Sequence, residues 1–143
     1  MDNKRIIFQN AEGGVSVIIP APGVSQADVL KAVPPGARYE IVDAADIPAD
    51  RTFRNAWFHD TTPAPQKVGV DVDKAKGICH EKRRAKRAEE FAPLDVQATI
   101  PAKAAQAEAA RQAIRDKHAA IQAEIDAAAD AAALKAILER EGL

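Results

Sequence analysis

The alanine-rich segment from Ala102 nearly to the C-terminus most narrows the folds open to this chain. It combines alanine with Gln, Glu, Lys and Arg, which are the strongest helix formers, so it predicts a helix. Ile114, Ile121 and Ile125 recur at helical spacing and form a narrow apolar stripe on one side. Such a helix is marginal alone, so it needs another helix of this chain, a copy of itself or a partner chain to cover the stripe.

The residues before and after this segment predict further helices. Residues 72–91 are rich in Lys, Arg, Glu and Ala, and they follow an acidic start at Asp71 that suits a helix N-terminus. Pro93 is expected to end this helix. Ile100-Pro101 begins the alanine-rich segment, and the sequence leaves open whether these two residues break a longer helix. Asp130 is a candidate N-cap for a short final helix that contains Leu134, Ile137 and Leu138.

The N-terminal part has a different pattern, typical of a small sheet. Residues 4–9 and 15–19 are β-branched and aromatic runs around a turn-forming cluster, so they predict a hairpin. Ser25 with Asp28 resembles a capping box and predicts a helix through residue 33, which we expect to cover the sheet. Residues 38–42 alternate and predict a third strand. The order is ββαβ, with an antiparallel or mixed sheet.

Residues 47–60, IPADRTFRNAWFHD, place aromatic side chains beside two arginines. Guanidinium groups stack on aromatic rings and form paired hydrogen bonds with carboxylates. Two interpretations stay open. Trp57 closes the hydrophobic core of the N-terminal domain, or the segment anchors a partner protein, because Trp and Arg are enriched at binding hot spots. The candidate partner-binding residues are Arg51, Arg54, Trp57 and Phe58.

A proline-containing stretch separates the two halves of the chain. Residues 61–71 contain Pro63 and Pro65, which restrict their own backbone and that of their predecessors, so an extended linker is expected. The predicted organisation is an α+β chain: a small ββαβ domain over residues 1–60, the linker, and an alanine-rich helical hairpin or coiled-coil region over residues 72–143. Apolar residues make up 47% of the chain but aromatic residues only 4%, so we expect the helical half to bury little large apolar surface and to associate with itself or a partner.

The charge distribution argues against nucleic acid as the main partner. The net charge is −1, which provides no overall attraction to phosphates. The basic run between Lys82 and Arg87 is the one local concentration, but Glu81, Glu89 and Glu90 flank it at helical spacing. A solvated, salt-bridged helix face is the favoured interpretation.

The sequence shows no catalytic, cofactor or metal constellation, so we expect no enzymatic activity, cofactor or metal site. Cys79 is the only cysteine, which excludes an internal disulfide, and it is expected to be a buried apolar residue of its helix. His59, His80 and His118 lie far apart in the sequence. No signal peptide or apolar run of about 20 residues is present. A soluble, unprocessed protein without membrane association is therefore expected, or one that is exported only as part of something larger.

Several motifs together resemble a family of small tailed-bacteriophage proteins found among tail and tail-fibre proteins. The strings are ADIPADRTFRNAWFHD, then VDVDKAKGICHEKRRAKRAEEFAPLD, then AARQAIRDKHAAI and ALKAIL. The resemblance covers most of the chain from about Val33 onwards. The sequence departs from the family pattern at Ile100-Pro101, where the family is normally helical.

The resemblance implies a small tail, baseplate or fibre-attachment component of a phage virion that acts by docking on other tail or fibre proteins. It would be made in the cytoplasm of the host bacterium and then join the virion tail. Two alternatives stay open: an assembly chaperone that is absent from the mature virion, and a nucleic-acid-binding accessory protein that uses the basic run. The helical half would support a homo-oligomer or a complex with another chain.

Overall fold

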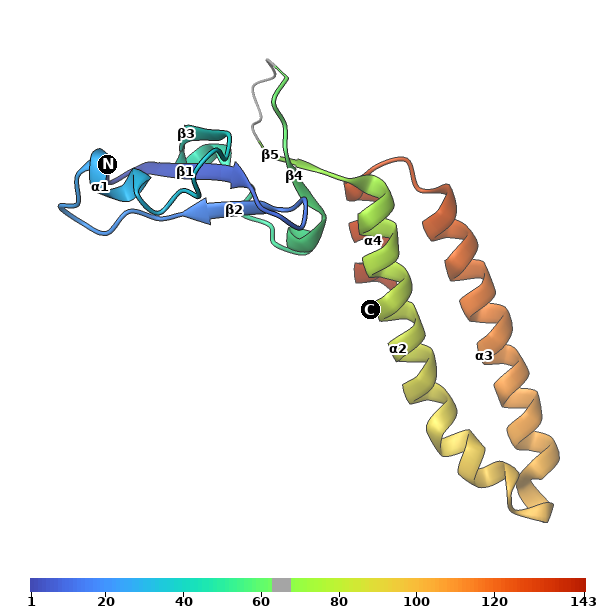
Figure 1. The fold of residues 1–143 in the computed structure, drawn as a ribbon. Coiled ribbons are helices and arrows are strands. Elements are labelled where there is room, and N and C mark those ends of the chain that lie inside the picture. Colours follow the sequence, from blue (N-terminus) through green and yellow to red (C-terminus); the bar gives the residue numbers. More distant parts are fainter. Residues whose placement is uncertain (63–67) are drawn as a thin grey trace. The chain divides into compact units, whose positions relative to one another are not determined.

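The computed structural model in Figure 1 describes residues 1–62 and 68–143. The chain divides into two compact units, Met1–Asp71 and Val72–Leu143. Strands, one short α-helix and two 3-10 helices, η1 (Ala44–Asp46) and η2 (Arg54–Ala56), build the first unit, and three longer helices build the second. The α+β fold class predicted from the sequence is confirmed.

The first unit contains a three-stranded sheet in the predicted ββαβ order. Its elements are β1 (Lys4–Gln9), β2 (Val15–Ile18), α1 (Gln26–Leu30) and β3 (Tyr39–Asp43). Strand β1 lies in the centre, between β2 and β3, and both pairings are antiparallel. Central position explains why its apolar side chains are the most deeply buried, with Ile6 and Ile7 completely inaccessible.

Helix α1 begins as predicted but is shorter than the predicted helix, which extended to Val33. The Ser25 side chain accepts a hydrogen bond from the backbone N–H of Asp28 at 3.2 Å and donates one to the Asp28 carboxylate at 2.6 Å. The helix then ends at Leu30, so it forms little more than one turn. Val29 is its one buried residue.

A second, two-stranded sheet covers the Ile7 face. Strand β4 (Trp57–His59) pairs antiparallel with β5 (Val68–Val70). The core cluster joins residues of both sheets: Ile7, Val15, Val42, Trp57 and Val68. The predicted linker therefore differs from the structure, because residues 68–70 are a strand of the first unit. The two prolines of that linker lie outside the described residues.

Three helices form the second unit: α2 (Val72–Ala98), α3 (Pro101–Ala127) and α4 (Ala131–Glu141). Helices α2 and α3 run side by side as an antiparallel hairpin, and α4 packs against both near the beginning of α2 (Figure 1). The predicted cap of the last helix is confirmed, because the carboxylate of Asp130 accepts a hydrogen bond from the backbone N–H of Ala133 at 2.8 Å.

Helix α2 does not end before Pro93, contrary to the prediction. Proline removes one backbone hydrogen bond and costs about 3 kcal/mol inside a helix. Contacts with α3 on both sides of this position offset part of that cost. Phe91 lies 5.9 Å from the guanidinium carbon of Arg115, and Asp95 forms a 3.0 Å ion pair with Arg111. Helix α2 ends later, at Ala98, and α3 begins after Ile100 with Pro101 in its first turn.

Most buried residues of the second unit lie near α4. Ile121 and Ile125 of the predicted stripe are buried there. The other buried residues of this unit are Ala75, Cys79 and Arg83 of α2, Ala107 and His118 of α3, and Leu134, Ile137 and Leu138 of α4.

Glu90 joins the two long helices through a pair of hydrogen bonds. One carboxylate oxygen lies 2.6 Å from the Lys117 ammonium and the other 2.8 Å from Nε2 of the fully buried His118. Burial raises the pKa of Glu90, but the hydrogen bonds and charges of Lys117 and His118 outweigh it, so this pKa lies below its ordinary value of 4.5.

Replacing Trp57 with alanine should destabilise the first unit by about 3–5 kcal/mol, because the removed side chain leaves a cavity between the two sheets. Equilibrium urea unfolding, followed by NMR signals of β1 amides, measures the loss. Phe58→Ala is the matched control, since Phe58 is 38% exposed and should cost far less. Equal losses in the two variants would show that Trp57 does not close this core.

Replacing Glu90 with glutamine should lower the stability of the second unit by about 1–3 kcal/mol at pH 7, because a charged hydrogen-bonding group is lost. The lowered pKa means that Glu90 contributes stability above about pH 4.5, and that this stability disappears as the pH falls through the folded-state pKa. The difference between the parent and Glu90→Gln, measured by helix circular dichroism in urea, should therefore shrink in acid. The exposed neighbour Glu89→Gln should show neither effect.

Candidate functional site

The hydrogen-bond pattern of the sheet leaves the outer edge of β2 open. The backbone N–H of Asn10 donates to the carbonyl of Gly14 at 2.9 Å. In an antiparallel pair, directly bonded and non-bonded residue pairs alternate, so Ser16 and Ile18 bond to β1 while Val15 and Val17 direct their N–H and C=O groups away from it. Such an edge is able to pair with another strand.

Arg54 occupies one end of this edge. Its Nη2 donates a 2.7 Å hydrogen bond to the carbonyl of Val15, and its guanidinium carbon lies 4.6 Å from the ring centroid of Trp57. Burial lowers the pKa of Arg54, and the charge of Arg51 lowers it further. The side chain therefore fixes the Trp57 ring against β2 as well as capping an edge carbonyl.

The four residues predicted to bind a partner differ in their access to solvent. Trp57 is only 1% exposed, so its ring belongs to the core. Arg51 is exposed, with its guanidinium carbon 6.0 Å from the Trp57 ring. Phe58 is exposed on one side, and the other side of its ring lies over Gly69, where it fills the space that a Cβ atom would occupy. Arg51 and Phe58 are thus the two residues of the set that are most accessible to a partner.

Arg51 lines a hollow of about 290 Å³ that the sequence did not predict. The hollow lies on the Ile7 face, because Arg5 and Val17 stand on that face of β1 and β2. Its lining residues are Arg5, Val17, Ile19, Ala44, Ile47, Pro48, Ala49 and Arg51. We name this feature the Arg5–Arg51 hollow; it combines an apolar floor with two guanidinium groups.

Neither guanidinium of the hollow forms an ion pair with a carboxylate of residues 1–62 or 68–143. Arg5 donates through Nη1 to the backbone carbonyls of Lys4 at 2.8 Å and Asp2 at 3.4 Å. The guanidinium carbon of Arg51 lies 6.0 Å from the centroid of the Trp57 ring. Positive charge therefore remains uncompensated beside an apolar surface, which favours a ligand that carries carboxylates.

The cysteine and the histidines do not assemble into a reactive centre within the described parts of the chain. Cys79 is fully buried as predicted, and burial raises the pKa of its thiol. Each histidine has a different carboxylate: His59 lies 3.7 Å from Glu40, His80 lies 2.8 Å from Asp126, and His118 binds Glu90. Among the described residues, no group of His, Cys, Asp and Glu is arranged to hold a metal ion.

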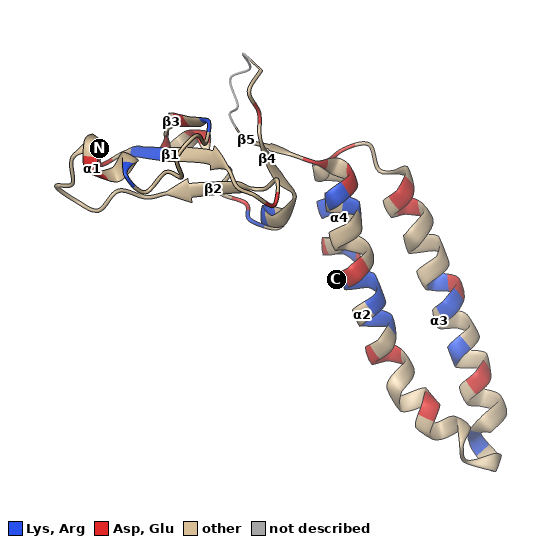
Figure 2. Ribbon diagram, in the orientation of Figure 1, with Lys and Arg blue, Asp and Glu red and all other residues tan. Residues whose placement is uncertain are grey.

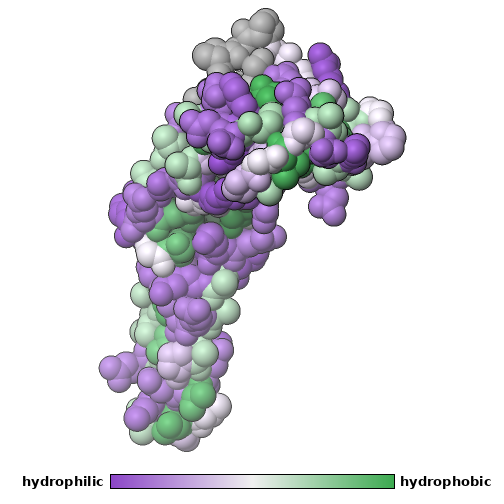
Figure 3. All heavy atoms as spheres, turned by 90° about the vertical axis from the view of Figure 1, so that its left-hand side faces the viewer, coloured by the Kyte–Doolittle hydropathy of each residue, from purple (hydrophilic) through white to green (hydrophobic). Residues whose placement is uncertain are grey.

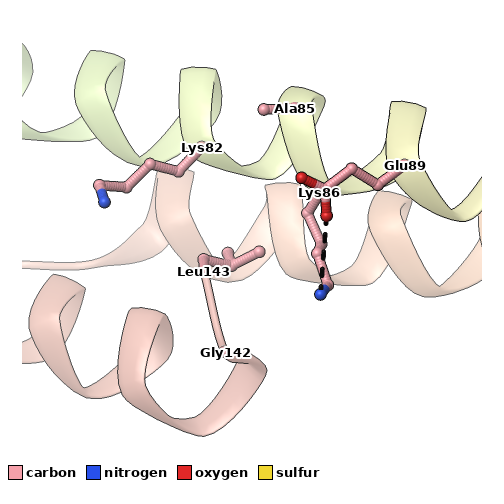
Figure 4. Close-up of a pocket in the computed structure, with 6 residues that line it drawn as sticks. All are labelled: Lys82, Ala85, Lys86, Glu89, Gly142 and Leu143. Atoms are coloured by element: carbon pink, nitrogen blue, oxygen red, sulfur yellow. Dashed lines mark ion pairs between the residues drawn. The ribbon is translucent and has the colours of Figure 1, made fainter.

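The basic run of α2 does not present all of its cations to solvent. Arg83 is 4% exposed, and acidic residues flank the basic run on both sides along the helix (Figure 2). Lys82 and Lys86 line a second hollow, of about 230 Å³, beside Gly142 and Leu143 (Figure 4). The ammonium group of Lys86 is 4.0 Å from the carboxylate of Glu89. This face resembles the salt-bridged helix surface favoured from the sequence.

Comparisons with family models, with curated proteins and with solved structures give no match for this chain. Within residues 1–62 and 68–143, no helix combines the length and the apolar character that crossing a membrane requires.

Arg54→Ala should destabilise the first unit by about 1–3 kcal/mol, because it removes a charged hydrogen bond and the stacking on Trp57. Arg51→Ala is the matched control, and it should change the free energy of unfolding by less than about 1 kcal/mol, since it removes a longer, exposed contact. Urea unfolding of both variants, followed by NMR signals of β2 amides, makes the comparison. If both substitutions cost the same, Arg54 has no special structural role.

Proposed function

We propose that this chain is a small structural component of a bacteriophage tail, in the tail, baseplate or fibre-attachment region, and that it acts by protein–protein docking. The resemblance of the DRTFRNAW segment and of the following helices to tail and tail-fibre proteins supports the viral assignment. The observation on which the docking role rests is the Arg5–Arg51 hollow, where two arginines that have no carboxylate partner within residues 1–62 or 68–143 border an apolar floor.

The helical unit supports a role in assembly with other chains. At the end of the α2–α3 hairpin, Val96 is 65% exposed and Ile100 is 41% exposed. Figure 3 shows apolar surface at this end, the lower end of the view. Helix α4 packs near the opposite end, so the described residues provide no third helix there. We propose that this end associates with a copy of the chain or with a neighbouring tail protein.

Mass spectrometry of purified particles of the encoding phage tests the structural role. Peptides of this chain should be present in constant ratio to known tail proteins, because a structural component has a fixed copy number. Tail assembly intermediates provide the matched sample.

Peptides found in intermediates but absent from finished particles would contradict the structural role and favour the assembly chaperone. Peptides found in neither sample would contradict both roles. Salt-dependent retention on DNA columns, checked in parallel, would favour the nucleic-acid alternative.

A further inference from the structure

We infer that the first unit binds an extended, acidic segment of a partner protein, which adds to the open edge of β2 and places a carboxylate in the Arg5–Arg51 hollow. This inference rests on the proposed docking function and identifies the chemistry of the partner. Addition of a strand to a sheet edge is a general mode of peptide recognition, in which backbone hydrogen bonds supply affinity and side-chain pockets supply specificity.

The position of the added strand follows from the groups that remain available on β2. Arg54 already occupies the carbonyl of Val15, so pairing is possible further along, at Val17. The N–H and C=O of Val17 point away from β1, because Val17 and Ile7 form a non-hydrogen-bonded pair. Just beyond the strand, Ile19 is 63% exposed, and Pro20 has no N–H to donate. The open stretch is short, which suits a short linear segment rather than a broad interface.

The acidic character of the partner follows from the hollow. Alternate side chains of an added strand point to the same face as Val17, where the hollow lies. A carboxylate there would be within the reach of two guanidinium groups that lack acidic partners among the described residues, while aliphatic neighbours would contact Ile47 and Pro48. Paired hydrogen bonds between arginine and carboxylate give both strength and directional preference.

Two other surfaces of the described residues differ from the β2 edge. Beside the outer edge of β3, Lys4 pairs with Asp43 at 2.7 Å, and the exposed Arg38 precedes the strand. The hollow beside α2 is lined by helices, which offer no strand edge, and Lys86 there has Glu89 as a neighbour. At β2, an open strand edge lies beside a hollow that two arginines line.

Selection from a random library of linear peptides tests the inference with the full chain as bait. Enriched peptides should alternate aliphatic and acidic residues. The tightest of them should bind at least about tenfold more weakly when its acidic residues are replaced by the corresponding amides, and when Arg5 and Arg51 are both changed to alanine. Arg38→Ala, which removes an exposed arginine of the same unit outside the hollow, should bind like the parent. Enrichment without acidic residues, or equal enrichment by the double variant, would overturn the inference.

Val17→Pro tests the strand addition, because it removes an outward N–H without removing a hydrogen bond to β1. It should weaken binding of the selected peptide about tenfold or more relative to Val17→Ala, which keeps the N–H. In the parent, the Val17 amide should exchange with solvent at least about tenfold more slowly when the peptide is bound, and this measurement decides the matter if Val17→Pro does not fold. Unchanged exchange would overturn strand addition.

The outcomes separate this inference from the proposed function. A chain that is present in phage particles but selects no acidic peptide leaves the structural role intact and overturns the inference. A chain that is absent from particles but binds acidic peptides through Val17 and the two arginines does the opposite.

Discussion

Burial of Trp57 is the constraint on which the first unit depends. A three-stranded sheet with a helix of little more than one turn cannot cover both of its faces, and Trp57 with Val68 supplies the missing layer over Ile7 and Val15. The ring is held from outside by Arg54, which also binds the Val15 carbonyl. Because these contacts occupy Trp57 and much of Arg54, the proposed recognition uses the neighbouring Arg51 and the part of the β2 edge that Arg54 leaves open.

Local sequence signals predicted the elements that are determined locally. Alternation of apolar residues predicted β1, β2 and β3, and the caps at Ser25 and Asp130 were correct because each cap depends on residues within one turn. The strand β5 was not predictable in this way, since three residues, Val-Gly-Val, are too short to show a period and depend on pairing with β4. The proposed end of α2 was wrong because contacts with another helix offset part of the local cost of proline.

The candidate site was predictable in part, for similar reasons. Arg51 was found because it lies beside aromatic residues in the sequence. Arg5 was missed because its position on the hollow depends on the register of β1 against β3, where it lies opposite Val42. The availability of Val17 depends on which residue pairs of β1 and β2 are hydrogen-bonded, and a pattern of alternating side chains does not determine this phase. The local sequence identifies a segment rich in arginine and aromatic residues, whereas the long-range pairing of strands decides which side chains and backbone groups lie at the site.

The second unit raises a different physical question, namely what fixes the alignment of two alanine-rich helices. Alanines are interchangeable along such an interface, so apolar packing alone favours neighbouring registers almost equally. Polar groups near the interface are not interchangeable: Glu90 meets Lys117 and His118 in only one alignment. Arg83 is buried, and its Nε and Nη1 lack hydrogen-bond partners among the described residues. Burial lowers the pKa of Arg83 most, and the charges of Arg87 and Arg84 lower this pKa further, while the charge of Asp126 raises it. Buried charge of this kind adds little net stability, so we expect Arg83 to favour one register of the hairpin at some cost to its stability.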